Sequence, residues 1–433
     1  MIALVQGPST VGAVPQAARP GAVATALAAV YCALLAFPAV IDLPGGVSPG
    51  QILMIGSLPI WWIAFLSRQG RVFDATARRG AAVVLSCSAF LILWAILSAF
   101  EVDIPFRAAR PALSLATAFA MYFMVIGCAT PGRLRLLCRI LCWSLAVTGV
   151  ITIVAMVEPN VYALIYQDKD RAYGFFKNPN QYGIALSTTL PVAIALLFAE
   201  RGRRVRWAIC VGILGVALMA SGSKANLLIT ALVVPGLLVL ATIIRFQGPE
   251  RVIMLMMTAV GCIVAGSGLV LALSIVNPRA LSILSDVVVD GDATGSIVSR
   301  GVIWAESLDL MRASPLFGVG AGQPIEGLSH SHNVLIDYGR TLGIPGLVFV
   351  TGMIVAICVV CALSATHAVT SHGASRADRH LCTGLAVSPV AYLAANFSSD
   401  SLGPTTSPYL YVFLFLSLAG RSLMHRPVRG WRA

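Results

Sequence analysis

Apolar blocks of about 20 residues recur along almost the whole chain and alternate with short polar segments. A helix of about 20 apolar residues is long enough to cross the hydrocarbon core of a bilayer. The pattern therefore predicts an all-α polytopic membrane protein that forms one helical bundle. We expect about 12 transmembrane helices, at 21–41, 51–67, 81–100, 111–128, 134–157, 181–200, 205–220, 225–244, 252–276, 344–364, 381–397 and 405–423.

Two long polar stretches interrupt this pattern and divide the chain. Residues 1–276 hold spans one to nine, with an outer loop at 158–180. Residues 277–343 form one large loop, the only stretch long enough to fold over the bundle, and residues 344–433 hold spans ten to twelve and a tail. Within the large loop, apolar residues at helical spacing around Arg300 and Trp304 predict short amphipathic helices.

Basic residues gather on one side of the predicted membrane. Alternate loops and the two tails collect 20 of the 30 lysines and arginines, with only four acids, Asp74, Glu200, Glu250 and Asp378. The positive-inside rule therefore predicts that both termini are cytoplasmic and that the two long loops are periplasmic. The net charge of +12 is thus a topology signal. It does not indicate nucleic-acid binding, because no basic patch interleaved with aromatic residues is present.

Composition agrees with a membrane protein. The chain is 58% apolar and 11% charged, and its mean hydropathy is +0.86, whereas about 25% of a soluble domain is charged. The first twenty residues carry only Arg19, so we expect no cleaved signal peptide. All ten cysteines fall in or beside apolar blocks without zinc spacing, which predicts small buried side chains and neither disulfides nor a metal site.

Two polar segments beside predicted spans carry cations. Arg171 and Lys177 precede Asn178-Pro179-Asn180, a turn for which we predict a helix N-cap at Asn180. Either this is a simple helix start, or the two cations face an anion near a positive helix end. Lys224 follows Ser221-Gly222-Ser223 at a span junction on the outer side. It either snorkels to the interface, as such lysines commonly do, or reaches a phosphate from a cavity between helices.

The large loop carries the other candidate cations and two histidines. Arg300 lies on a mostly apolar helix face, so it needs an acceptor; that acceptor is either one of Asp286, Asp290 and Asp292 or a pyrophosphate. The glycine-rich stretch 315–322 is no Walker loop and is either a flexible turn or a close approach to a ligand. His330 and His332 open a helix on which Gly339 would admit a close neighbour. Two histidines there, near Arg300, Arg312 and Arg340, favour a functional role over a structural one.

Metal binding is the weaker interpretation. No histidine at i+4 and no cysteine accompanies His330 and His332, which disfavours zinc. The pairs Asp168/Asp170 and Asp290/Asp292 have an Asp-x-Asp spacing that can hold a divalent cation, but a solvated turn is the commoner outcome. We therefore expect no metal and no cofactor.

Three blocks, in order, resemble the O-antigen ligase family of membrane glycosyltransferases. They are Gly174-x-Phe176-x-Asn178-Pro179-Asn180, then Ser299-Arg300 with Trp304 and 315–320, and then His332-Asn333-x9-Gly343-x-x-Gly346. The resemblance implies a C-type glycosyltransferase-like fold in the bacterial inner membrane with a periplasmic active site. It also implies transfer of a glycan from undecaprenyl pyrophosphate to lipid A–core. We expect a monomer or weak dimer that needs no metal or cofactor.

The resemblance also assigns residues. The essential histidine of the family maps to His332, its loop arginine to Arg300, and a second family cation to Lys224, where this chain has lysine in place of arginine. Arg312 followed by Leu316 fits a looser loop-arginine pattern. Donor or acceptor binding is expected of the polar residues around these three, Arg171, Lys177, Asn180, Arg312, His330, Asn333 and Arg340.

Three alternatives remain. An O-antigen polymerase would use another lipid-linked repeat as acceptor, and a protein O-oligosaccharyltransferase would use a protein. A transporter of lipid-linked glycan would show paired charges at mid-membrane and symmetric broken helices. The predicted spans contain almost no acids, and the chain shows no such symmetry.

Overall fold

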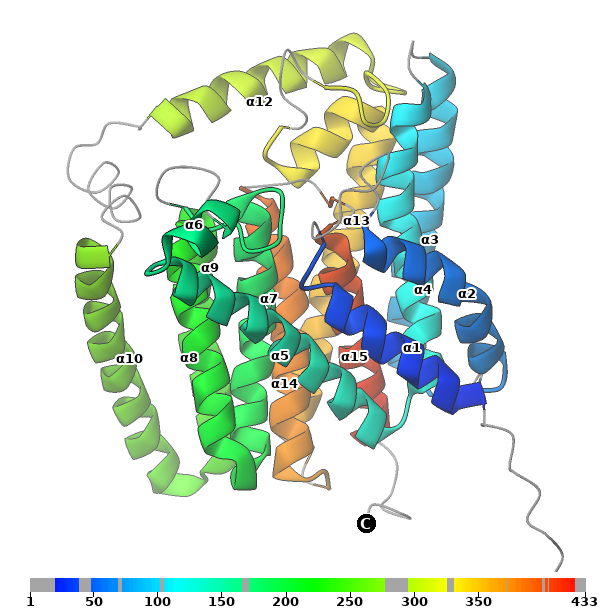
Figure 1. Ribbon diagram of the computed structural model, residues 1–433. Coiled ribbons are helices and arrows are strands. Elements are labelled where there is room, and N and C mark those ends of the chain that lie inside the picture. The colour runs from blue at the N-terminus through cyan, green and yellow to red at the C-terminus, as the bar shows by residue number, and fades with distance from the viewer. Residues whose placement is uncertain are drawn as a thin grey trace, which may run out of the picture.

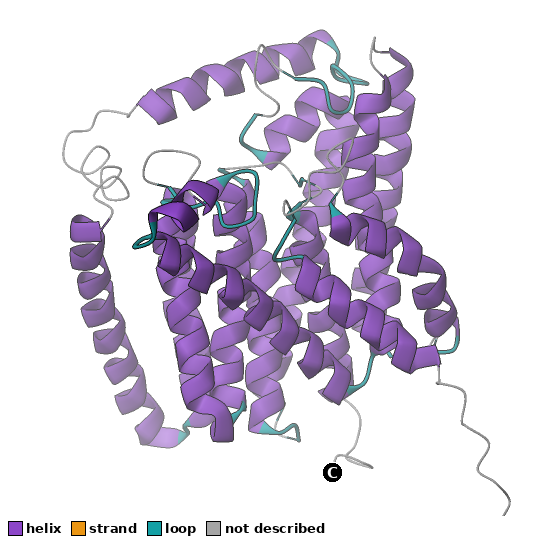
Figure 2. Cartoon of the chain, in the orientation of Figure 1, coloured by secondary structure: helices purple, strands orange, loops and turns teal. Residues whose placement is uncertain are grey.

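The computed structural model describes residues 20–38, 48–68, 72–101, 105–165, 171–276, 295–324, 331–371, 373–398, 402–403 and 405–424. These residues form helices and connecting turns, with no strand among them (Figure 2). The α-helices are α1 (Pro20–Leu34), α2 (Pro49–Leu66), α3 (Ala75–Ser98), α4 (Ala109–Cys128), α5 (Pro131–Ala155), α6 (Pro159–Ile165), α7 (Pro179–Ala199), α8 (Arg204–Ser221), α9 (Lys224–Arg245), α10 (Gly248–Val276), α12 (Gly295–Ala313), α13 (Val334–Thr370), α14 (Arg376–Asn396) and α15 (Ser407–Met424).

The all-helical membrane fold predicted from the apolar pattern is confirmed. Within the described residues, nine helices are long and apolar enough to cross a membrane, and each of the twelve predicted spans falls on a helix. Three of the twelve predicted spans fall on helices outside these nine. They are α1, which has 15 residues, α14, which opens with a charged turn, and α15. The number twelve therefore stays a prediction, while the polytopic character is established.

The centre of the bundle is formed by α7, α14 and α15. The side chains of α7 from Tyr182 to Leu196 are buried, as are those of α15 from Ser407 to Ala419. α14 packs against α7, α13, α15 and α9, which makes it the common neighbour of the helices that carry the candidate site. All ten cysteines have free thiols, and eight of them are buried, as their apolar surroundings predicted.

The edge of the bundle is formed by α10 (Figure 1). None of residues Gly248–Gly268 is buried, and α9 is the neighbour against which α10 packs. A groove of about 680 Å³ lies between α8, α9 and α10. Its lining is almost wholly apolar and runs along α9 from Leu227 to Arg245. At about 1.5 Å per residue, that length matches the hydrocarbon core of a bilayer.

Two predicted boundaries differ from the structure. The N-cap of α7 is Asn178, whose side chain accepts a hydrogen bond from the backbone N–H of Asn180 at 2.7 Å; our prediction of Asn180 was wrong by two residues. Pro179 takes the first helical position, where its missing N–H and fixed φ favour a helix start. The predicted loop 158–180 also contains a short helix, α6.

The large loop covers one end of the bundle. α12 lies across that end, and α13 continues from it into the bundle (Figure 1). The helix α13 is two helices joined at Gly343, which has φ 68° and ψ −162°. The prediction of a short helix before Gly343 and a span after it therefore matches the backbone. Gly339 does admit a close neighbour, since Met311 of α12 packs against it.

Candidate functional site

The first part of the site is the start of α13. Asn333 is its N-cap, and its side-chain oxygen accepts hydrogen bonds from the backbone N–H groups of Leu335 and Ile336 at 3.0 and 3.2 Å. His332 precedes this cap with φ +54°, and no other described residue except glycine has a positive φ. Non-glycine residues rarely adopt this conformation, which clusters at functional sites. The half-buried imidazole is therefore held on a constrained backbone.

Ser331 fixes that backbone from the other side. Its N–H and its hydroxyl both donate to Asp337 Oδ1, at 3.0 and 3.2 Å. Its carbonyl accepts a hydrogen bond from Trp304 Nε1 at 2.9 Å, and its hydroxyl lies 3.0 Å from that of Ser307. Trp304 and Ser307 belong to α12, the helix that carries Arg300. Ser331, which directly precedes His332, is therefore bonded to that helix.

A buried ion pair supports this corner. Arg340 Nη2 donates to Asp337 Oδ1 at 2.9 Å, and Nη1 donates to the carbonyl of Gln323 at 2.8 Å. The Arg340 side chain is 1% exposed. This guanidinium is bonded inside the protein, so the structure gives Arg340 a supporting position. Substrate binding by Arg340 stays a prediction.

The glycine-rich stretch packs against the kink of α13. The N–H of Val319 donates to the carbonyl of Arg340 at 2.9 Å, and the N–H of Ile344 donates to that of Pro315 at 2.7 Å. A Cβ atom on Gly318 would overlap the Arg340 backbone, and one on Gly343 would overlap the Pro315 carbonyl. These two glycines therefore allow two backbones to cross, a third outcome beside the turn and the ligand approach considered from sequence.

The second part of the site joins two segments that are distant in sequence. Arg171 donates from Nη2 to Asn180 Oδ1 at 2.8 Å and from Nε to the carbonyl of Ser221 at 3.1 Å. Asn180 Oδ1 also accepts from the hydroxyl of Ser223 at 3.1 Å. Asn226 donates from Nδ2 to the Asn180 carbonyl at 3.3 Å. The segment before α7 and the turn before α9 thus form one polar cluster.

Lys224 stands at the first position of α9, directly after this turn. The approach of the two helices is close, because a Cβ atom on Gly183 would lie 2.8 Å from both Asn226 Nδ2 and Ser223 Cβ. Lys177 is exposed in the same segment as Arg171. Of the predicted cations, Arg171 and Lys224 are therefore brought together.

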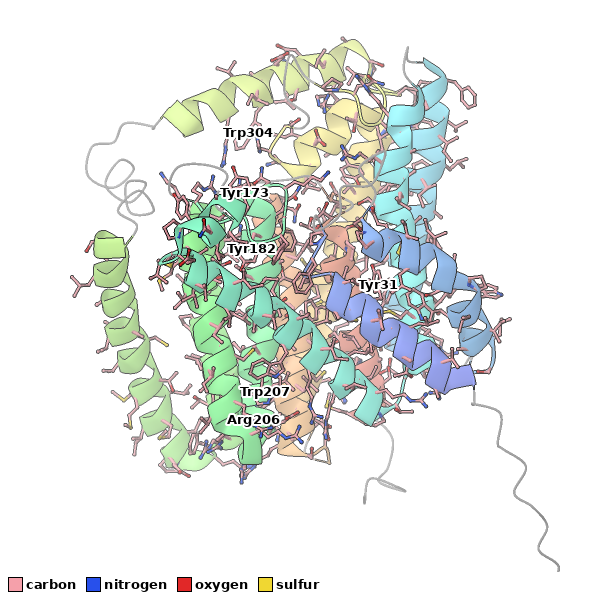
Figure 3. The ribbon with its side chains drawn as sticks, viewed as in Figure 1. Tyr31, Tyr173, Tyr182, Arg206, Trp207 and Trp304 are labelled. Atoms are coloured by element: carbon pink, nitrogen blue, oxygen red, sulfur yellow. The ribbon has the colours of Figure 1, made fainter. Side chains whose placement is uncertain are left out.

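Helix packing places both parts at one end of the bundle. Asn333 Nδ2 donates to the carbonyl of Phe397, the residue that ends α14, at 3.3 Å. The same helix packs along α7 and α9, whose first turns carry Asn180 and Lys224. Figure 3 shows Trp304 and Tyr173 near this end, whereas Trp207 and Arg206 lie near the other.

The remaining predicted residues fall in different places. Arg300 is half-buried on α12, and within the described chain its guanidinium makes no hydrogen bond or ion pair. Burial lowers the pKa of Arg300 from its usual value, which still leaves arginine charged at neutral pH. Arg312 is 74% exposed and bonds to Asp309 at 2.8 Å. His330, and the acids proposed for Arg300 or for a metal, lie outside the described residues.

The sequence model of the O-antigen ligase family matches residues 208–351. This segment of the chain is therefore similar to the O-antigen ligase family, which supports the resemblance seen in the sequence. A comparison with curated proteins found no match. The matched segment runs from α8 to the second part of α13 and includes Lys224, Arg300 and His332. The family supports ligase- or polymerase-type function in lipopolysaccharide synthesis, by a multi-pass bacterial membrane protein of glycosyltransferase type.

Some polar residues of the matched segment were missed from sequence. They are Asp337, Ser331, Ser307 and Asn226, which form hydrogen bonds between segments of the site. Asp337 had one available signal, its i,i+3 spacing to Arg340 on a helix. For metal binding, the described residues contain no group of three His, Cys, Asp or Glu side chains.

Proposed function

We propose that the protein is an O-antigen ligase that moves a glycan from undecaprenyl pyrophosphate to a sugar hydroxyl of lipid A–core at the periplasmic face. The observation that carries the proposal is the position of His332. It stands at the head of α13, beside the helix of Arg300, at the end of the bundle where Arg171 and Lys224 also lie. A base and several cations at one membrane surface suit a reaction on a lipid pyrophosphate.

In the proposed reaction the acceptor hydroxyl attacks the anomeric carbon of the donor sugar. A bond forms between the acceptor oxygen and that carbon, while the bond from the carbon to the phosphate oxygen breaks. The hydroxyl proton passes to the imidazole of His332, because histidine is the side chain that most often serves as a general base. Undecaprenyl pyrophosphate leaves with the electron pair. One direct displacement inverts the anomeric centre.

Cations stabilise the charge that develops on the leaving pyrophosphate. Arg300 has a guanidinium without a protein partner in the described chain, and a guanidinium binds phosphate oxygens through two hydrogen bonds. Lys224 and Arg171 supply further positive charge from the polar cluster before α9. In this mechanism the side chains provide the electrostatic stabilisation, so the transfer needs no metal ion.

The groove between α8, α9 and α10 supports a lipid-linked donor. Its lining includes Met219 and Leu227 on either side of the turn that carries Lys224. A polyprenyl tail in this apolar groove would keep its pyrophosphate at the cluster of Arg171 and Lys224 while the tail stays within the bilayer. Such an arrangement favours an enzyme that draws its donor sideways from the membrane.

The test is transfer in vitro with purified protein. Undecaprenyl-pyrophosphate-linked glycan and lipid A–core are mixed with wild-type protein, with His332→Ala or with His367→Ala, and the products are separated on a gel. His367 is a matched control near the other end of α13. We expect a glycan ladder on lipid A–core that disappears only with His332→Ala. Normal transfer by that variant would contradict the general-base role; elongation on the undecaprenyl carrier alone would identify a polymerase.

A further inference from the structure

Three arginines on α5 differ in their partners. Arg135 forms an ion pair with Asp378, and Arg139 forms one with Glu200 at 2.7 Å. Arg133, at the start of the same helix, has no carboxylate partner within the described chain. Its Nη1 atom is buried and has no hydrogen-bond partner among the residues that the structure describes. A buried donor without an acceptor is unfavourable, and more so when it is charged, so this position suits a ligand that brings an acceptor.

The guanidinium of Arg68 lies with that of Arg133 beside Gly21, in the first turn of α1. Arg68, which follows α2, donates from Nη1 to the carbonyl of Ala129 at 2.8 Å. A Cβ atom on Gly21 would lie 2.8 Å from Arg133 Nη1 and 3.2 Å from Arg68 Nη2. Burial lowers the pKa of Arg68, and the neighbouring charge of Arg133 lowers it further. The first N–H groups of α1 add partial positive charge at the same point.

Three acidic residues at this end of the bundle form ion pairs with other arginines. Asp74 accepts from Arg421 at 3.1 Å, and Glu200 and Asp378 hold Arg139 and Arg135. Residues 1–41 contain no Asp or Glu at all. Glu250, the fourth acid predicted on this side, lies in the first turn of α10, the helix at the opposite edge of the bundle (Figure 1). The charge of Arg68 and Arg133 is therefore not neutralised by a described carboxylate.

We propose that Arg68, Arg133 and the first turn of α1 bind the phosphate of an acidic phospholipid. Both arginines lie where their helices leave the predicted membrane, on the face where basic residues gather and which the positive-inside rule assigns to the cytoplasm. Exposed apolar side chains lie on the same three elements, Val23 on α1, Leu66 on α2 and Leu136 on α5. They offer a surface for acyl chains beside the phosphate, which a free phosphate ion would not use. The site is independent of the proposed glycan transfer.

The experiment measures lipid-dependent thermal stability of the full-length protein in detergent. Phosphatidylglycerol, phosphatidylcholine or inorganic phosphate is added, and the shift in melting temperature is recorded. We expect a rise with phosphatidylglycerol that phosphatidylcholine does not produce, because a protein is stabilised by what binds its native state. The double variant Arg68→Gln/Arg133→Gln should lose most of this shift. The control Arg204→Gln/Arg206→Gln removes the same charge from exposed positions on α8 and should keep it.

Two results would overturn the proposal. One is a full phosphatidylglycerol shift in Arg68→Gln/Arg133→Gln, and the other is an equal shift with inorganic phosphate, which would make the ligand a free anion. If the double variant does not fold, Gly21→Ala provides the test without loss of charge. Its methyl group would lie 2.8 Å from Arg133 Nη1, so the shift should shrink; an unchanged shift would contradict the site. The amount of phosphatidylglycerol that copurifies, measured by mass spectrometry, should fall in the same variants.

Discussion

The Oδ1 atom of Asp337 accepts two hydrogen bonds from Ser331, one from its backbone N–H and one from its hydroxyl. The same oxygen binds Arg340 at 2.9 Å. Because residue 331 directly precedes His332, one buried carboxylate oxygen determines the backbone from which the imidazole extends. It also connects the glycine-rich loop, through Arg340 and Gln323, to the corner that carries the proposed base.

Removing Asp337 should damage both stability and transfer. Asp337→Ala leaves the charge of Arg340 buried and unpaired, which commonly costs about 3–5 kcal/mol. We expect a lower melting temperature in detergent and loss of transfer. The double variant Asp337→Leu/Arg340→Met removes both charges and should regain much of the stability, but not the activity, because Ser331 still lacks its acceptor. Wild-type transfer by a stable double variant would show that Asp337 does not position His332.

Gly343 should not tolerate a side chain. Its φ and ψ lie in a region used almost only by glycine, where another residue costs about 1–3 kcal/mol, and a Cβ atom there would overlap the Pro315 carbonyl. Gly343→Ala should therefore reduce the melting temperature and the rate of transfer. Gly352→Ala lies on the same helix, where a Cβ atom would make only an ordinary contact with Cys87. That control should be as stable as the wild type or slightly more so. Equal loss of stability in both variants would show that the close contact between Gly343 and the Pro315 backbone is not the reason for the effect of Gly343→Ala.

Asn180→Asp tests the polar cluster with almost no change of shape. The carboxylate could still accept from Arg171 and Ser223, as Asn180 Oδ1 does now. Its negative charge would hold Arg171 and repel the donor pyrophosphate. Since a hydrogen bond to a charged group contributes about 1.5–3 kcal/mol, we expect the KM for donor to rise about tenfold or more. Steady-state kinetics at fixed acceptor measure this, and an unchanged KM would place the pyrophosphate elsewhere.

Transfer should continue in the presence of EDTA. Arg300, Lys224 and Arg171 carry the positive charge that the leaving group requires in the proposed mechanism. We expect the same initial rate with excess chelator as with added magnesium. Loss of activity that magnesium restores would instead make the Asp168/Asp170 or Asp290/Asp292 pair a metal site, and would show that the cations alone are insufficient.

Local patterns were sufficient for some features of this molecule. Apolar blocks predicted the positions of the helices, because the length of a span and the cost of exposing polar backbone in lipid leave few alternatives. The cap of α7 was misplaced because Asn178 and Asn180 are both good caps on local grounds. Pro179 decides between them, since it favours the first position of a helix and restricts the residue before it.

Contacts between distant segments could not be predicted in this way. From sequence, Gly318 was interpreted as part of a flexible turn or ligand loop and Gly343 as part of a motif. In the structure both are needed because the 315–320 stretch crosses α13 too closely for a Cβ atom at either position. Arg340 looked like one more cation near His332, although it is buried against Asp337 and Gln323. In both cases the role of the residue depends on a contact with another segment or on a buried helix face. The sequence pattern alone shows neither of these.

The kink of α13 limits how far the proposed base can stand above the membrane. The helix before Gly343 begins at Val334. At about 1.5 Å per helical residue, with at most about 7 Å more for the two residues back to His332, the imidazole lies no more than roughly 22 Å beyond the start of the following span. A pyrophosphate joined to a membrane-embedded tail has a similarly limited reach. However long the donor glycan is, its reducing end would meet the imidazole close to the membrane surface in the proposed reaction. The acceptor hydroxyl must therefore come down to the membrane.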